Sequence, residues 1–168
     1  MAESISHFAI KTIGLSRCNG RKPCTLLEAA KHNLRQIQSE LGANGHIDPC
    51  RMAHNVTLAG PSTAAQVQAR ANELLSTVDT SKLKRDHVQS LEVVFSLPPG
   101  TPIEPLAYFA KCVEWLRVAV PLPVLLAVVH MDEAAPHAHV LLLPVMGGQH
   151  VGGALNTRPS GQHLHRLA

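Results

Sequence analysis

Apolar residues recur along the chain with two different periods, and each period predicts one kind of element. Alternating or near-continuous runs rich in β-branched residues predict strands. These runs are residues 8–13, 52–58, 88–97, 124–129 and 140–145. The run at 124–129 has no polar interruption, which predicts a strand buried in the middle of a sheet.

Three segments carry the three- and four-residue spacing of amphipathic helices. They are residues 25–41, 61–78 and 102–120. The first begins at Thr25, and Glu28 three residues later completes the sequence of a capping box, in which hydroxyl and carboxylate each accept a backbone N–H. Gly42 follows the last apolar position and predicts the end of this helix.

Together these elements predict an α+β fold. We expect an antiparallel sheet with the helices packed on one face and the last two strands at its centre. A chain of 168 residues has the length of one ordinary domain. We expect the folded domain to span residues 1–146, and residues 147–168, rich in Gly and His, to form a loosely ordered tail.

Composition narrows the class of protein. Apolar residues make up 45% of the chain and charged residues 16%, which excludes a disordered polar chain. Since no apolar run is long enough to span a bilayer, we expect no membrane segment. The formal net charge of +3 permits a polyanionic partner without requiring one.

The cysteines and histidines differ in what they predict. Cys18, Cys24, Cys50 and Cys112 form no C-x-x-C pair, and the N-terminus has no secretory signal, so we expect reduced thiols in a cytoplasmic protein. The gap between Cys18 and Cys24 is a poor zinc spacing, which favours ordinary loop or core roles over half a zinc site. Histidine, with 11 residues, is the unusual count and points to metal or acid–base chemistry.

Three of these histidines surround the last predicted turn. His137 and His139 stand two apart at the start of a strand, so both imidazoles project to one face. His130 ends the preceding strand, and the short turn makes the two strands antiparallel neighbours. We therefore predict a divalent-metal site on the central strands, on the face opposite the helices, with open positions for substrate oxygens. Asp132 and Glu133, in the turn, would add an oxygen ligand or support a histidine from outside, which favours manganese or magnesium.

The segment from His130 to His139 resembles the H-x-D-E-x-x-P-H-x-H motif of the MobV (Pre/Mob) plasmid mobilisation relaxases, which are HUH endonucleases. Residues 31–35 resemble the first motif of that family, H-N-x-R on a helix near the N-terminus. Residues 47–55 resemble the second, I-D-x-x-R with an asparagine a few residues on. The order and approximate spacing of the motifs agree over nearly the whole chain.

The resemblance implies an enzyme that nicks and rejoins one DNA strand at a plasmid origin of transfer, in mobilisation or recombination, with residues 1–146 as the relaxase catalytic domain. In this family a side chain attacks a phosphodiester and stays joined to the DNA 5′ end, while a bound metal neutralises the phosphate. In the MobV branch the nucleophile is the histidine of the first motif, here His32, which implies a phospho-histidine link. Glu133 or Asp132 would orient His32 or set its protonation; we assign Glu133 as the second catalytic residue.

The same resemblance assigns the remaining motif residues to DNA. Arg35, one turn along the helix from His32, would hold a phosphate in a bidentate contact. Asn33, Arg51 and Asn55 are expected DNA contacts, and Asp48 is expected to support the site together with Asp132. The implied partner is plasmid DNA at the origin of transfer, as single strand and as supercoiled duplex, in the bacterial cytoplasm. A longer form of the chain would form a homodimer.

Three alternatives stay open. A tyrosine nucleophile would make the chain a replication-initiator or transposase-like nickase, and Tyr108 is its single tyrosine. The low net charge and the 3% of aromatic residues fit a non-catalytic DNA- or metal-binding remnant. A metal hydrolase of small substrates would need a closed pocket, whereas histidines on an open sheet suit a long strand.

Overall fold

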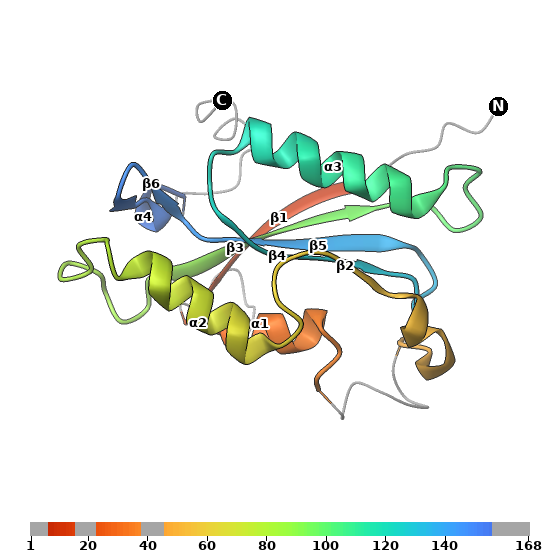
Figure 1. The fold of residues 1–168 in the computed structure, drawn as a ribbon, viewed down its shortest axis with the longest axis horizontal. Coiled ribbons are helices and arrows are strands. Elements are labelled where there is room, and N and C mark those ends of the chain that lie inside the picture. The colour runs from red at the N-terminus through yellow and green to blue at the C-terminus, as the bar shows by residue number, and fades with distance from the viewer. Residues whose placement is uncertain (1–6, 16–22, 38–45, 156–168) are drawn as a thin grey trace.

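Five strands form one antiparallel sheet (Figure 1). The computed structural model describes residues 7–15, 23–37 and 46–155. The strands of the sheet are β1 (His7–Gly14), β2 (Val56–Ala59), β3 (Val88–Ser96), β4 (Val124–His130) and β5 (His137–Leu142). Their order across the sheet is β1-β3-β5-β4-β2, with every neighbouring pair antiparallel. The structure therefore confirms the antiparallel sheet and the central position of β4 and β5.

The helices begin where the sequence supplies caps. They are α1 (Leu26–Asn33), η2, a 3-10 helix (Pro49–His54), α2 (Ala64–Leu75), α3 (Pro105–Ala119) and α4 (Gly152–Leu155). The capping box of α1 is present: the Thr25 hydroxyl accepts from the backbone N–H of Glu28, whose carboxylate accepts from the backbone N–H of Thr25. Among the described residues, no helix combines the length and the apolar character needed to cross a bilayer.

The helices cover both faces of the sheet, and the prediction that they pack on one face is wrong. Figure 1 shows α3 on one side and α1 and α2 on the other. On the α3 side, Phe109, Val113 and Leu116 pack against Phe95 and Val140 of the sheet. The reason is that β4 and β5 are apolar on both of their faces, so each face needs its own layer of helix.

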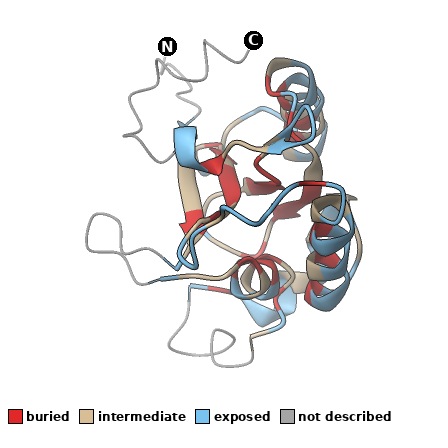
Figure 2. Cartoon of the chain, turned by 90° about the vertical axis from the view of Figure 1, so that its left-hand side faces the viewer, coloured by how far each residue is buried: buried red, intermediate tan, exposed pale blue. Residues whose placement is uncertain are grey.

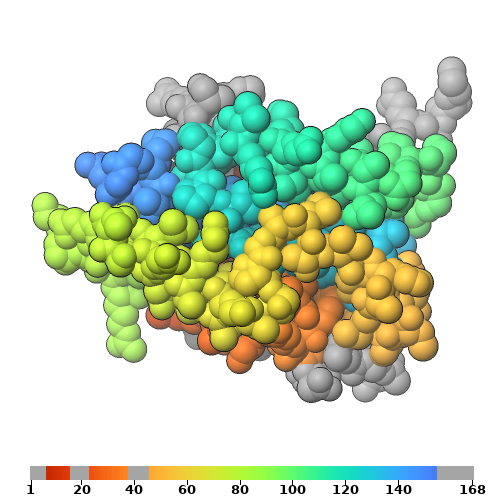
Figure 3. Space-filling view, in the orientation of Figure 1, coloured from red at the N-terminus to blue at the C-terminus, as the bar shows by residue number. Residues whose placement is uncertain are grey.

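The other face carries the second half of the core. Leu26 and Ala30 of α1 and Val67 of α2 pack against Leu126 and Leu141. Figure 2 shows buried residues in the sheet and on the inward sides of the helices, with the outward sides exposed. In Figure 3, α3 lies above the yellow-orange segment that includes β2, an edge strand of the sheet, and the yellow-green α2 lies to its left.

Helix α1 is shorter than the sequence pattern predicts. It ends at Asn33, and Leu41, the last predicted apolar position, lies outside the described residues. After the C-cap Leu34, Arg35 adopts φ 55°, its N–H donates to the His32 carbonyl, and the N–H of Gln36 donates to the Lys31 carbonyl. This is a Schellman ending with arginine at the position that usually holds glycine.

The end of the described chain belongs to the fold. The expected boundary after residue 146 falls inside a hairpin of β6 (Val145–Met146) and β7 (Gln149–His150), which α4 follows. The predicted strand at 52–58 is also divided, because η2 reaches His54 and β2 begins only at Val56. Residues 156–168 of the expected tail lie outside the described residues.

Candidate metal centre

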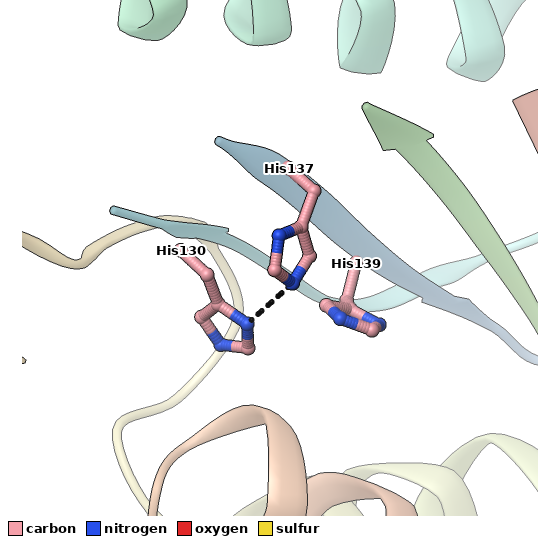
Figure 4. Close-up of side chains that lie close together, drawn as sticks. All are labelled: His130, His137 and His139. Carbon is pink, nitrogen blue, oxygen red and sulfur yellow. Dashed lines mark hydrogen bonds between the residues drawn. The ribbon is translucent and has the colours of Figure 1, made fainter. Parts of the chain in front are cut away.

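Three histidines converge on the sheet face that α1 and α2 cover, not on the face predicted to be free of helices. His130 ends β4 and pairs in register with His137 on β5, and His139 follows on the same side of β5. One ring nitrogen from each histidine lies within 4.8 Å of the corresponding nitrogens of the other two. Figure 4 shows the imidazoles turned toward one another from two neighbouring strands. The site is beside the helices because Leu141, one step further along the same face of β5, packs in the core under α1 and α2.

One nitrogen of each imidazole, here called the outer nitrogen, is bound to an oxygen of the surrounding protein, and the other, the inner nitrogen, faces the neighbouring histidines. Nε2 of His130 lies 2.7 Å from the Asn33 carbonyl, Nδ1 of His137 lies 2.9 Å from the Ala135 carbonyl, and Nδ1 of His139 lies 2.7 Å from Oε1 of Glu92. These oxygens accept, so in each neutral ring that outer nitrogen carries the proton. The other nitrogen of each ring then holds a free lone pair, which is the state that a metal ligand needs.

The inner nitrogens conflict unless a cation lies between them. Nδ1 of His130 and Nε2 of His137 are 3.3 Å apart, the contact dashed in Figure 4. Both are acceptors when the outer bonds are kept, so one ring must become a cation, give up its outer bond or share a metal ion. Burial, with the nearby His139, lowers the pKa of His130 to about 3, and burial also lowers the pKa of His139. Neutral rings with converging lone pairs therefore fit a divalent metal ion.

Glu92 is a functional candidate that the sequence analysis missed. Its carboxylate, 1% exposed, accepts from His139 and from the Asn33 side-chain amide at 2.9 Å, and its second oxygen pairs with the ammonium of Lys11. Burial acts to raise the pKa of Glu92, but the hydrogen bond from His139 and the charge of Lys11 outweigh it and bring the pKa to about 2. The signal in the sequence was an acidic residue within an apolar strand, Leu91–Val93.

The turn after β4 is held by buried ion pairs. Nε and Nη2 of Arg35 donate to the two oxygens of Asp132 at 2.9 and 2.7 Å, and Nη2 also donates to Glu133 at 2.7 Å. The Asn55 amide donates to Asp132 at 2.7 Å and accepts from the backbone N–H of Met131 at 2.8 Å. Burial acts to raise the pKa of Asp132, yet the hydrogen bonds from Arg35 and Asn55 lower it overall.

Several residues that we expected to contact DNA are bound to other protein groups in this structure. Arg35 is 7% exposed and Asn33 is 1% exposed, so both side chains face the protein interior in this structure. Asn55 also binds the turn, as the preceding bonds show. The cause lies in pairings across long stretches of sequence, since Arg35 and Asp132 are 97 positions apart.

Asp48 and Arg51 reach the same turn from η2. The N–H of Asp48 donates to the Asp132 carbonyl at 2.7 Å, and the Asp48 carboxylate caps η2 by accepting from the N–H of Cys50. Arg51, which is exposed, donates to the Glu133 carbonyl at 3.2 Å. The second motif of the sequence therefore supports the turn that precedes the histidine pair.

His32 and Tyr108 lie on opposite sides of the sheet. His32, near the end of α1, is half-buried, and its ring centroid lies 5.9 Å from that of His139 with the planes at 80°. Tyr108 is on α3 and packs at the edge of the core on the other face. Of the two candidate nucleophiles, only His32 lies beside the three histidines.

Comparison with known proteins finds one matching family and solved structures that share this fold. The model of one family, Mob_Pre, described as plasmid recombination enzyme, matches residues 13–159. A crystal structure of the MobM relaxase domain (MOBV; Mob_Pre), Mn-bound and bound to 22-nucleotide oriT DNA of plasmid pMV158 at pH 5.5, superposes with a TM-score of 0.71 and 17% identity over 95% of this chain and 80% of that one. The same domain with 26-nucleotide oriT DNA gives a TM-score of 0.62 and 16% identity over 96% and 81% of the two chains. No curated protein matches the sequence.

Proposed function

This chain belongs to the Mob_Pre family of plasmid recombination enzymes, and we propose that it nicks and rejoins one strand of plasmid DNA at an origin of transfer. The observation that carries the proposal is the position of His32 beside three histidines whose inner nitrogens converge. The similar MobM relaxase domain, which was solved with oriT DNA, supports this DNA as the substrate. The proposed place of action is the cytoplasm of a plasmid-bearing bacterium.

We propose a divalent metal, manganese before magnesium, at the three histidines. Nδ1 of His130 and Nε2 of His137 and His139 would hold it, because the outer nitrogens of these rings are bound to oxygens. The Mn-bound state of the similar MobM domain supports manganese. When bound, the ion would neutralise the scissile phosphate and polarise its phosphorus.

His32 is the proposed nucleophile. A lone pair on its neutral imidazole attacks the phosphorus, the bond from phosphorus to the 3′ oxygen breaks, and that oxygen leaves as a hydroxyl after taking a proton. The DNA 5′ phosphoryl group then stays on the imidazole, and attack by a 3′ hydroxyl reverses the step and rejoins the strand. Glu133, which Arg35 holds 3.7 Å from Nε2 of His137, is the proposed group that sets the protonation of His32. Arg51, exposed on η2, is the proposed contact with the DNA backbone.

A cleavage assay tests this proposal. The protein is incubated with Mn²⁺ and supercoiled plasmid carrying a candidate transfer origin, and relaxed DNA joined to protein is measured. We expect an acid-labile adduct that is lost in His32→Ala and kept in Tyr108→Phe. His54→Ala is the matched control, because His54 is an exposed histidine on η2 and should leave the adduct unchanged.

Two outcomes would overturn the proposal in different ways. An adduct that persists in His32→Ala and disappears in Tyr108→Phe would keep a nickase and reject the histidine nucleophile. Absence of any nick, with Mn²⁺ still bound by the wild type, would reject the strand-transfer activity and leave a metal-binding protein.

A further inference from the structure

Glu92 connects the candidate metal centre to two other elements of the fold. Its Oε1 accepts from Nδ1 of His139 on β5 at 2.7 Å and from the side-chain amide of Asn33 on α1 at 2.9 Å. Its Oε2 pairs with Lys11 of β1, whose side chain is 40% exposed. One buried carboxylate therefore joins the histidine ligands to a helix and to the edge strand.

Asn33 makes a second connection to the same centre. Its backbone carbonyl lies 2.7 Å from Nε2 of His130, while its side chain binds Glu92. Two of the three candidate ligands are thus bound, directly or through one carboxylate, to a single residue of α1. That residue directly follows His32, so the position of the His32 backbone depends on both bonds.

We propose that Glu92 is a positioning residue of the metal centre, which orients His139 from outside and, through Asn33, holds the end of α1 that carries His32. This inference rests on the proposed function, since it assigns Glu92 and Asn33 to the same centre. It assigns neither residue to contact with DNA, which agrees with their burial at 1% exposure each.

The charge on Glu92 gives the proposal a testable sign. A carboxylate that accepts from the outer N–H of a ligand histidine fixes the ring and makes its inner nitrogen a better donor to metal. Lys11 acts against this effect, because its positive charge withdraws electron density from the carboxylate and repels a nearby cation. Removal of the Glu92 charge should therefore weaken metal binding, and removal of the Lys11 charge should strengthen it.

The experiment is a titration of the metal-free protein with Mn²⁺, followed by the loss of the free-ion electron paramagnetic resonance signal. Glu92→Gln should weaken Mn²⁺ binding by about 10- to 100-fold. Lys11→Met, at a half-exposed position, should bind Mn²⁺ a few-fold more tightly than the wild type. Ser90→Ala is the matched control, because Ser90 is buried on the same face of β3 and its hydroxyl bonds only to backbone carbonyls.

A merely structural ion pair would give a different pattern. Glu92→Gln and Lys11→Met would then both lower the unfolding temperature in chelator and leave the Mn²⁺ affinity of the folded protein unchanged. That result, or weaker binding in Lys11→Met with wild-type affinity in Glu92→Gln, would overturn the proposal. Since Lys11→Met changes a half-exposed side chain, its result stands even if Glu92→Gln fails to fold.

Asn33→Ala tests the connection to His32. The backbone carbonyl that binds His130 remains in this variant, so Mn²⁺ affinity should stay within about threefold of the wild type. Adduct formation at saturating Mn²⁺ should fall by about 10- to 100-fold, because a shift of about 1 Å in a reacting group has an effect of this size. An unchanged rate would overturn this part of the proposal.

The metal and cleavage readouts also separate this inference from the proposed function. Weaker Mn²⁺ binding in Glu92→Gln, in a protein that never nicks DNA, would support the inference and reject the function. Normal nicking by the wild type, with an unchanged Mn²⁺ affinity in Glu92→Gln, would support the proposed function and reject the inference. A wild type that binds no Mn²⁺ would overturn both.

Discussion

Replacement of Arg35 separates two opposing contributions to the stability of this domain. The residue has φ 55°, a left-handed conformation that disfavours every residue with a Cβ atom. The same conformation turns its guanidinium into a buried pair with Asp132 and Glu133. Arg35→Ala loses the pair and keeps the unfavourable backbone, whereas Arg35→Gly loses the pair and relieves the backbone.

The expected losses in the free energy of unfolding follow from the contacts of Arg35 and from general values for such contacts. Removing one partner of a buried ion pair costs about 3–5 kcal/mol, and we expect the lower end because Asp132 keeps its hydrogen bond from Asn55. The left-handed backbone costs alanine about 1–2 kcal/mol more than glycine. The larger entropy of glycine in the unfolded chain takes back about 0.4–1 kcal/mol. Arg35→Gly should therefore be more stable than Arg35→Ala by roughly 0–1.6 kcal/mol, with about 0.8 kcal/mol at the middle of the two ranges, although both are less stable than the wild type.

Urea unfolding followed by circular dichroism, with a chelator present, measures these differences without a contribution from metal. The stability order of the two variants tests the left-handed conformation of Arg35, because alanine normally stabilises a helix more than glycine does. If Arg35→Gly unfolds at lower urea than Arg35→Ala, the left-handed assignment is wrong. If both variants lose less than about 1 kcal/mol, the ion pair does not stabilise the fold as argued.

Three further predictions concern pH, metal and packing. Burial raises the pKa of Asp132 but Arg35 and Asn55 lower it more, so its folded pKa lies below the unfolded value of about 3.9. Its contribution to stability is present above the unfolded value and is lost as pH falls through the folded one, so Asp132→Asn should flatten the fall in urea midpoint measured from about pH 6 to pH 2. His137→Ala should abolish the rise in Tm on addition of Mn²⁺, which in the wild type corresponds to about 2.7 kcal/mol at 100 times Kd; a rise in the variant would exclude His137 as a ligand. Phe109→Ala, at a fully buried position, should cost about 3–5 kcal/mol in urea unfolding, and a loss below 1 kcal/mol would contradict the packing of α3.

Local patterns in the sequence predicted the elements and the histidine cluster well. The Thr25–Glu28 capping box and the alternation of His137 and His139 depend on residues within a few positions of one another. The apolar run of β4 already required cover on both faces of the sheet, and the expectation of one helical layer did not follow from it. That error was one of interpretation, since the signal was present.

Contacts between distant segments could not be predicted in the same way. An acidic residue within the apolar strand β3 marks Glu92 as unusual, but only the fold brings it to His139, 47 positions later. Arg35 looked like a free cation on a helix because its partner is 97 positions away. The sequence also continued the apolar spacing of α1, whereas the left-handed turn at Arg35 ends the helix early.

The strand order also has a consequence for how the protein folds. Among the pairings of the sheet, only β4 with β5 joins strands consecutive in the chain, and the six-residue turn between them allows this hairpin to form on the microsecond scale. All three candidate ligands lie on that hairpin, but the oxygens that orient two of them, from Asn33 and Glu92, arrive only when α1 and β3 dock across long loops. A nascent hairpin would therefore hold a metal ion weakly, and tight retention would begin late, when the most slowly closing contacts of the sheet are made.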